Sequence, residues 1–182
     1  MKLKINNKEN IGQCNALSYI FYKKVFKINI FEDLEKLREL LVNITEEQNV
    51  IEFYEILYRL VYILLFTYNQ NIEEFEIWIK TIKIEDLTEE IINKTIEEFL
   101  KSFIDEEVIK ELEKIPNNSG KSIFPEHEFL KICMNCGLHI EDLKLLTYID
   151  VVKIFLVSCA ETKQVPRFKE ATQADWDRLA LL

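Results

Sequence analysis

Two cysteines in the second half of the chain have a spacing that can carry chemistry. Cys133 and Cys136 form the C-x-x-C pattern "CMNC", with His127 and His139 on either side of it. This spacing binds zinc in some small proteins and performs thiol–disulfide exchange in others. A zinc site needs thiolates and imidazoles that converge from a knuckle, whereas a redox site needs a preceding strand and a helix start.

The sequence around this pattern favours a structural role for both thiols. The segment "EHEFLKICMNC" predicts a helix that contains Cys133 and Cys136, and His127 stands well before the first thiol. Cys14 and Cys159 add no further ligand pair. We therefore expect no metal and interpret the cysteines as small buried apolar side chains. A small zinc or thiol-redox protein using Cys133 and Cys136 is the alternative.

The segment "SGKS", residues 119–122, matches the end of a phosphate-binding loop. Such a loop has the pattern G-x-x-x-x-G-K-[ST], whose first glycine opens the backbone turn that holds phosphate. Ile115 occupies the position of that glycine, and the charged helical pattern "DEEVIKELEKI" precedes it in place of a buried strand. Nucleotide binding is therefore disfavoured, and the segment is better interpreted as a seam between two modules.

Nucleophilic catalysis is also disfavoured. The chain has 2 histidines, close together in sequence, and no serine lies between two glycines as in a nucleophile elbow. Carboxylate pairs identify no site in a chain with 32 Asp and Glu residues. We expect a protein that is not an enzyme and needs no cofactor.

The elements that must position these residues are predicted to be mainly helices. "MKLKIN" alternates Leu3 and Ile5 with lysines before the turn-forming "NNK", which predicts a short β-hairpin ending at Ile11. Asn15 is expected to cap a first helix. In a second helix, "FEDLEKLRELL" places one apolar stripe, formed by Phe31, Leu34, Leu37, Leu40 and Leu41.

The most apolar helix is predicted over residues 46–68, opened by a capping box of Thr45 and Gln48. Its charged residues are spaced three and four apart, so we expect one exposed edge formed by Glu52, Glu55 and Arg59.

Three shorter helices are predicted to follow. Asn71 is expected to cap the first, Thr88 the second and Asp105 the third. The second has apolar residues at helical spacing, and we expect them to form core: Ile91, Ile92, Ile96, Phe99, Leu100 and Phe103.

Residues 116–122, "PNNSGKS", are the one cluster of turn formers in the chain. Beyond it, Pro125 suits the first turn of a helix that stops at Gly137, and Thr147 with Asp150 opens another. We predict a mainly α fold: a small N-terminal β-hairpin followed by a helical domain, then a smaller helical C-terminal domain. The predicted boundaries are 1–116 for the acidic first domain, 117–123 for the linker and 124–182 for the second domain.

The charge distribution argues against two classes of partner. The net charge is −9, and residues 73–113 alone carry 14 acidic and 5 basic residues. Such a segment repels a phosphate backbone, so we expect no nucleic-acid partner. The longest apolar run, "LVYILLF", is far shorter than the roughly 18 residues of a membrane span. With no signal-peptide pattern at the N-terminus, we expect no membrane partner, a cytosolic location and reduced cysteines.

Three further segments of the chain form recognisable motifs. The chain opens with "MKLKINNKE" before acidic amphipathic helices and ends with "RFKEATQADWDRLA". Between them, "CGLHIEDLKLLTYIDVVKI" has its pattern carried by Gly137, Leu138, Leu143, Leu146, Thr147, Asp150 and Val151. These motifs resemble the start, the "ATQ-(E/A)-D-(W/F/I)-D-R" ending and the downstream signature of the tail assembly chaperones of long-tailed bacteriophages and phage-tail-like bacteriocins.

The resemblance implies a non-enzymatic chaperone in the host bacterial cytoplasm that is absent from the mature particle. Its first module would coat the tape measure protein, with several copies along it, and its second would recruit tail tube subunits. In the family, a long form joins both modules by programmed ribosomal frameshifting, and this chain resembles that form, with the seam at 119–122.

Trp176 and Leu179, three residues apart in the last predicted helix, are our candidate docking residues, because so short a helix should not keep such bulk exposed without a partner. Packing of these side chains back onto residues 124–160 is the alternative.

Two other functions stay open. A structural tail or baseplate adaptor would remain in the particle, which distinguishes it from a chaperone. A DNA-binding regulator would use the helices around Gly137 as a helix-turn-helix, but the nearly neutral charge of residues 117–182 argues against it.

Overall fold

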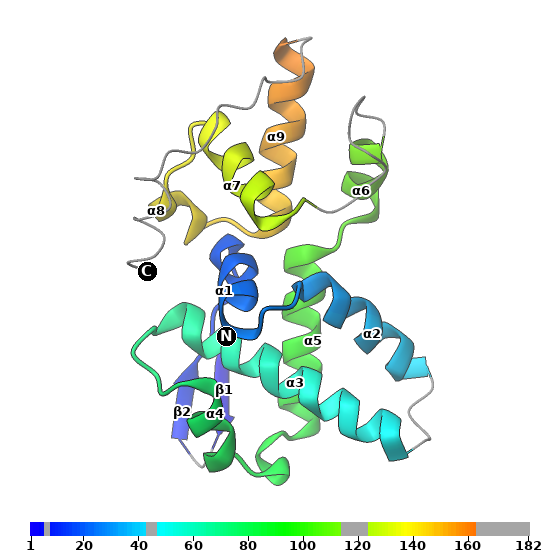
Figure 1. Cartoon of the computed structure of the whole chain (residues 1–182), viewed down its shortest axis with the longest axis vertical. Helices are drawn as coiled ribbons and strands as arrows, with labels where there is room; N and C mark the ends of the chain where they lie inside the picture. Colours follow the sequence, from blue (N-terminus) through cyan, green and yellow to red (C-terminus); the bar gives the residue numbers. More distant parts are fainter. Residues whose placement is uncertain (6–7, 43–46, 114–123, 163–182) are drawn as a thin grey trace.

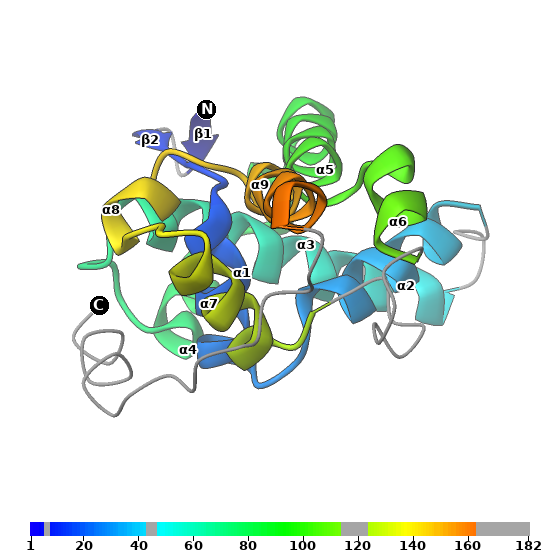
Figure 2. The ribbon, with the colours of Figure 1, turned by 90° about the horizontal axis from the view of Figure 1, so that it is seen from above.

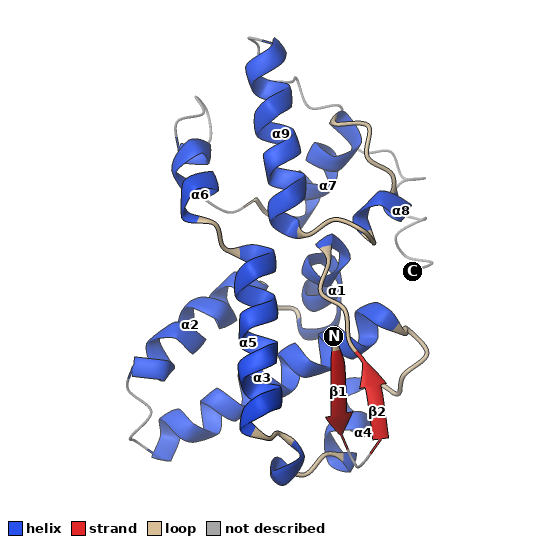
Figure 3. Cartoon of the chain, turned by 180° about the vertical axis from the view of Figure 1, so that it is seen from behind, coloured by secondary structure: helices blue, strands red, loops and turns tan. Residues whose placement is uncertain are grey.

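The chain begins with a two-stranded antiparallel hairpin. In a computed structural model, which describes residues 1–5, 8–42, 47–113 and 124–162, strand β1 (Lys2–Ile5) pairs with β2 (Lys8–Ile11) so that Leu3 faces Asn10. The alternation in β1 buries Leu3 and Ile5 and exposes the lysines between them, as the period of a strand requires. Figure 3 shows this hairpin as the one sheet among the residues described.

Helices account for most of the rest, which confirms the predicted mainly α class with a small N-terminal hairpin (Figure 1). They are α1 (Ala16–Phe26), α2 (Ile30–Val42), α3 (Glu47–Tyr68), α4 (Phe75–Trp78), α5 (Glu89–Phe103), α6 (Glu106–Glu113), α7 (Glu126–Asn135), α8 (Ile140–Leu143) and α9 (Tyr148–Thr162). Two 3-10 turns, Ile79–Thr81 and Ile84–Asp86, lead from α4 to α5.

Local capping explains where several helices begin. The Asn15 side chain accepts a hydrogen bond from the Leu17 N–H at 3.0 Å, and Thr88 does the same for Ile91 at 3.4 Å. These bonds satisfy amide donors that a first helical turn leaves free. The predicted caps at these two positions are thus confirmed. The predicted capping box of Thr45 and Gln48 cannot be compared, because residues 43–46 lie outside the described part.

Helix α3 is the centre of the core. Its fully buried residues include Ile56, Leu60 and Leu64. The hairpin reaches this helix through Gly12, where an added Cβ would come within 3.0 Å of the Leu64 Cβ, and the Gln13 N–H donates to the Leu64 carbonyl at 2.9 Å. A side chain at this position would push Leu64 away by a few tenths of an ångström, so glycine suits this close approach.

Two of the predictions are wrong. Arg59 does not share an exposed edge with Glu55; it turns inward and forms a paired contact with Asp33 of α2, at 2.8 Å from Nε to Oδ2 and 3.1 Å from Nη2 to Oδ1. Helical spacing cannot reveal a partner that comes from another helix. Helix α4 begins after Glu74, so Asn71 is not its cap.

Helices α7, α8 and α9 lie over α1, while α6 lies above α2 on the other side of the molecule (Figures 1 and 2). Tyr148, at the start of α9, packs against α1, α5 and α7 at once. Its ring centroid is 5.0 Å from that of Tyr19 in α1, 5.5 Å from that of Phe103 in α5 and 4.9 Å from that of Phe129 in α7. The described residues on both sides of the predicted linker therefore share one hydrophobic core. The domain boundaries stay a prediction, since 117–123 lies outside the described residues.

Candidate functional site: an apolar groove

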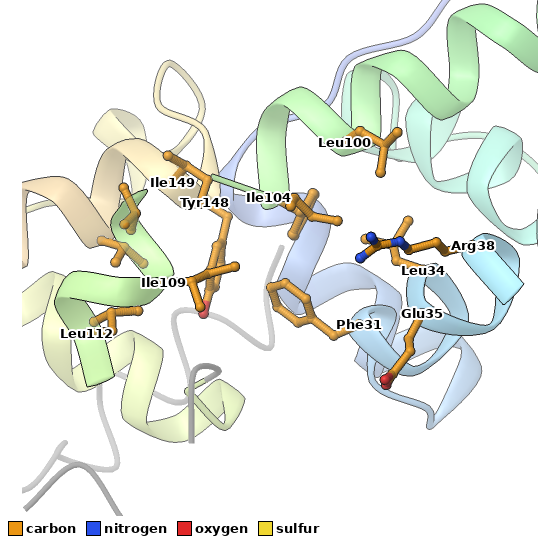
Figure 4. A pocket seen from close by; sticks show the side chains of 13 residues that line it. Phe31, Leu34, Glu35, Arg38, Leu100, Ile104, Ile109, Leu112, Tyr148 and Ile149 are labelled. Atoms are coloured by element: carbon orange, nitrogen blue, oxygen red, sulfur yellow. The ribbon is translucent and has the colours of Figure 1, made fainter. Parts of the chain in front are cut away.

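A hollow of about 350 Å³ lies between α2, α5, α6 and α9 (Figure 4). Its sides carry Phe31 on α2 and Ile109 on α6, with Tyr148 of α9 between them. The remaining lining residues are Leu34, Glu35, Arg38, Leu100, Phe103, Ile104, Val108, Leu112, Ile149 and Val152. All but Glu35 and Arg38 are apolar or aromatic.

A second hollow, of about 280 Å³, adjoins the first. It shares Leu34, Arg38, Leu100 and Ile104 with it and continues between α2 and α5 to Leu41 and Ile96. We call the two together the α2–α5 groove. Val42, which follows Leu41 at the end of α2, is 80% exposed.

The width of the apolar stripe on α5 explains why the groove stays open. Phe99 and Phe103 are buried against the rest of the core, whereas Leu100 is 40% exposed and Ile104, just after the helix, is 37% exposed. Neighbouring positions in a helix differ by about 100° in direction. One packing partner therefore covers Phe99 and Phe103 but leaves the next face of α5 uncovered.

The groove-facing stripe of α2 follows the same rule. Phe31, Leu34, Arg38 and Leu41 are spaced three and four apart and line the groove, and Asp33 points to α3 instead. From the sequence, Phe31 and Leu41 were expected on one apolar stripe, and Leu100 was expected in the core. The signal for a groove was present in the number of apolar positions on α5, which exceeds what one helix face can hold.

Charged groups surround the groove but do not converge within it. Glu35, Arg38 and Glu106 line its edges. Helices α2, α5 and α6 together carry 12 acidic and 5 basic residues. Beside the groove, Lys153 of α9 donates to Asp105 at 2.9 Å, and this hydrogen bond lowers the pKa of the Asp105 carboxyl. Since no set of polar groups converges on one point, the groove suits apolar side chains better than a polar small molecule.

The cysteines predicted as a zinc or redox alternative lie away from this groove. Cys133 is buried in α7, and burial raises the pKa of its thiol to about 12. Cys136 ends the same helix, 3.8 Å from the Ser158 hydroxyl, and burial raises its pKa as well. A raised pKa disfavours the thiolate form, which metal ligation and thiol exchange use. No group of three potential metal ligands occurs within the described ranges.

The two histidines do not complete such a site. His127 is exposed on α7, and His139 precedes α8, where its backbone N–H donates to Asp142 at 2.7 Å. Cys14 is buried beside α1, and burial raises its pKa to about 12. The candidate docking residues Trp176 and Leu179 lie outside the described residues, so the structure does not place them relative to the groove.

The resemblance motif has a clear structural role. Gly137 has a φ of 73°, and the N–H groups of Gly137 and Leu138 donate to Met134 and Cys133, which closes the end of α7. Thr147 and Asp150 cap α9 reciprocally, with bonds of 2.9 and 3.1 Å. Leu143 and Val151 are buried. The motif thus positions α8 and α9, and the first turns of α9 form one wall of the groove.

Comparisons with protein-family models, with curated proteins and with solved structures found no match to this chain. Over the residues that the structure describes, no helix is both long and apolar enough to cross a membrane.

Proposed function

We propose that this protein is a non-enzymatic tail assembly chaperone that holds an apolar helix of the tape measure protein and recruits tail tube subunits. The observation that carries the proposal is the α2–α5 groove, in which Leu100 and Ile104 present apolar surface without a covering element among the described residues. An amphipathic helix laid in an apolar groove is a common mode of recognition.

The size of the groove suits a partner that is later released. Burying one large aliphatic side chain contributes about 1.5–3 kcal/mol to the free energy of binding. A few such side chains from a client helix therefore give reversible binding. A chaperone must cover its client and then be displaced when tube subunits polymerise. A groove of moderate size meets both requirements better than an extensive interface does.

Co-expression of the full chain with the tape measure protein and the tail tube protein encoded beside it tests the proposal. We expect the full chain to keep the tape measure protein in the soluble fraction and to retain the tube protein with it. A double variant, Leu100→Gln with Ile104→Gln, should lose the tape measure protein. The matched control is Ile84→Gln, because Ile84 is similarly exposed at 50% but lies outside the groove.

Failure of the full chain to retain either protein would contradict the proposal. The proposal also places the protein in the host bacterial cytoplasm and not in the finished particle. Its presence in purified particles at a fixed copy number would instead identify a structural adaptor.

A further inference from the structure

The charge around the α2–α5 groove constrains what can occupy it. The groove itself is mostly apolar, and its charged lining consists of Glu35, Glu106 and one cation, Arg38, which borders both hollows. The three helices that supply most of its lining carry 12 acidic and 5 basic residues, a net charge of −7. A partner that lies along this groove therefore meets negative potential beside its apolar face.

The dimensions of the groove point to a helix. Its lining runs along α5 from Ile96 to Leu100 and on through Ile104. At 1.5 Å per residue, these eight steps correspond to roughly 12 Å, and the hollow continues beyond them to Leu112 on α6. A partner helix of about four turns would cover this length, with apolar residues at every third or fourth position.

A second copy of this chain is disfavoured by charge. It also carries a net charge of −9, so two acidic surfaces would have to meet. Like charges placed together across an interface oppose binding. The chain's own residues 163–182 carry 4 basic and 3 acidic residues, so charge does not separate them from a partner helix, and their removal is therefore part of the test.

We propose that the α2–α5 groove binds a basic amphipathic helix, whose apolar face packs on Leu100 and Ile104 and whose Lys and Arg residues lie beside Glu35 and Glu106. This inference deepens the proposed function, on which it rests, by naming the surface and the chemistry of the client segment. The acidic rim speeds encounter and selects the cationic helix, and the apolar floor holds it.

Three designed peptides of 18 residues test the proposal by fluorescence anisotropy with the full chain. The first is an amphipathic helix with leucines on one face and lysines on the other. The second has the same leucines with glutamates in place of the lysines. The third has the composition of the first in scrambled order, so it keeps the charge but has no apolar face.

We expect the cationic amphipathic peptide to bind at least tenfold more tightly than either other peptide at low salt. Its affinity should fall several-fold between 50 and 300 mM salt, because screening shortens the range of the acidic rim. The Leu100→Gln, Ile104→Gln double variant should weaken its binding at least fivefold, and Ile84→Gln should not. Glu35→Gln with Glu106→Gln should reduce the dependence on salt.

Equal binding of the cationic and scrambled peptides, or an affinity unchanged in the groove double variant, would overturn the proposal. A dimer that the groove variant dissociates in sedimentation would assign the groove to a second copy. Binding of the cationic peptide only after removal of residues 163–182 would assign the groove to the chain's own segment. Both results would also overturn the proposal.

These outcomes are distinguishable from failure of the proposed function. If the groove binds the cationic peptide but the tape measure protein does not co-purify, the chaperone assignment fails, while the assignment of the groove as a site for a basic amphipathic helix remains supported. If the tape measure protein co-purifies with the double variant as well as with the unmodified chain, the surface assignment fails and the chaperone function stands.

Discussion

The two sides of helix α2 are built in opposite ways. Toward α3, Asp33 is buried and forms a paired contact with Arg59, and the Tyr22 hydroxyl also donates to Asp33. Toward α5, the same helix presents apolar side chains that are only partly covered, including Phe31 and Leu41. The first side is closed around a buried ion pair, and the second is apolar and open.

The Asp33–Arg59 side of α2 makes a contact that the fold requires, whereas the apolar side is free to bind a partner. A buried carboxylate must keep its partners, because an unpaired buried charge is strongly destabilising. The closed side, with this ion pair, therefore fixes how α2 lies on α1 and α3. An exposed leucine has no such requirement, so the apolar side can gain a partner without breaking anything inside the protein.

The largest effect is expected on the closed side. Arg59→Ala should lower the free energy of unfolding by about 3 kcal/mol, because it leaves the Asp33 carboxylate buried without its cation. Urea denaturation measures this change. Replacing both residues, as Asp33→Leu with Arg59→Met, should recover much of the stability. A loss no larger than that of Ile84→Ala would show that the contact is not closed in solution.

Tyr22→Phe is the next test of this side. Loss of a hydrogen bond to a charged group should cost about 1.5 kcal/mol at neutral pH. Burial, together with the charge of Asp33, raises the Tyr22 pKa well above its ordinary value of 10.0. The unfolded chain therefore releases this proton first, and stability should fall as the pH rises above about 10.

The loss of stability at high pH should be smaller in Tyr22→Phe than in the unmodified chain. Comparing the two proteins removes the contribution of other titrating groups, because both proteins contain them. Denaturation midpoints at pH 9 and pH 11 for both proteins provide the measurement. An identical decrease in the two would show that Tyr22 does not cause it.

Thr147→Ala tests whether the groove wall is formed in advance. The substitution removes the side-chain cap of α9 and should lower stability by about 1 kcal/mol. Because the first turn of α9 lines the groove, the affinity for the cationic peptide should fall as well. Thr147→Ser keeps the hydroxyl and serves as the control. Unchanged affinity in Thr147→Ala would place the binding surface away from α9.

The smallest effect on stability is expected on the open side. Leu100→Gln with Ile104→Gln should change the free energy of unfolding by about 1 kcal/mol or less, because both side chains already contact solvent. Binding of the client should nevertheless be lost. If this double variant is as unstable as Arg59→Ala, the groove is part of the closed core and the comparison fails.

The sequence predicted well the features that depend on neighbouring residues. Asn15 and Thr88 cap their helices, Gly137 takes the left-handed conformation and Thr147 pairs with Asp150, all through contacts within a few positions. Each of these requirements is local, so the residue type alone reveals it.

Features that depend on distant elements were not predictable in this way. Arg59 looked like one of several exposed charges until α2 brought Asp33 against it. Leu100 looked like core, because nothing in its own helix shows which of two apolar faces the fold will cover. The closed side and the open side of α2 are both products of tertiary packing.

The contact between the start of α1 and the loop before α9 has a consequence for how the protein is made. The Gln13 and Asn15 side chains both donate to the Lys144 carbonyl, at 2.9 and 3.1 Å, and the Ala16 N–H donates to that of Leu146 at 2.7 Å. During synthesis at about 5–20 residues per second, α1 leaves the ribosome on the order of ten seconds before this loop does. The apolar side of α1, which includes Tyr19, therefore stays exposed for that time, until α7 and α9 are synthesised and pack on it. A product that ends before residue 124 would lack α7 and α9, so this side of α1 would stay exposed. Another protein would then have to cover it.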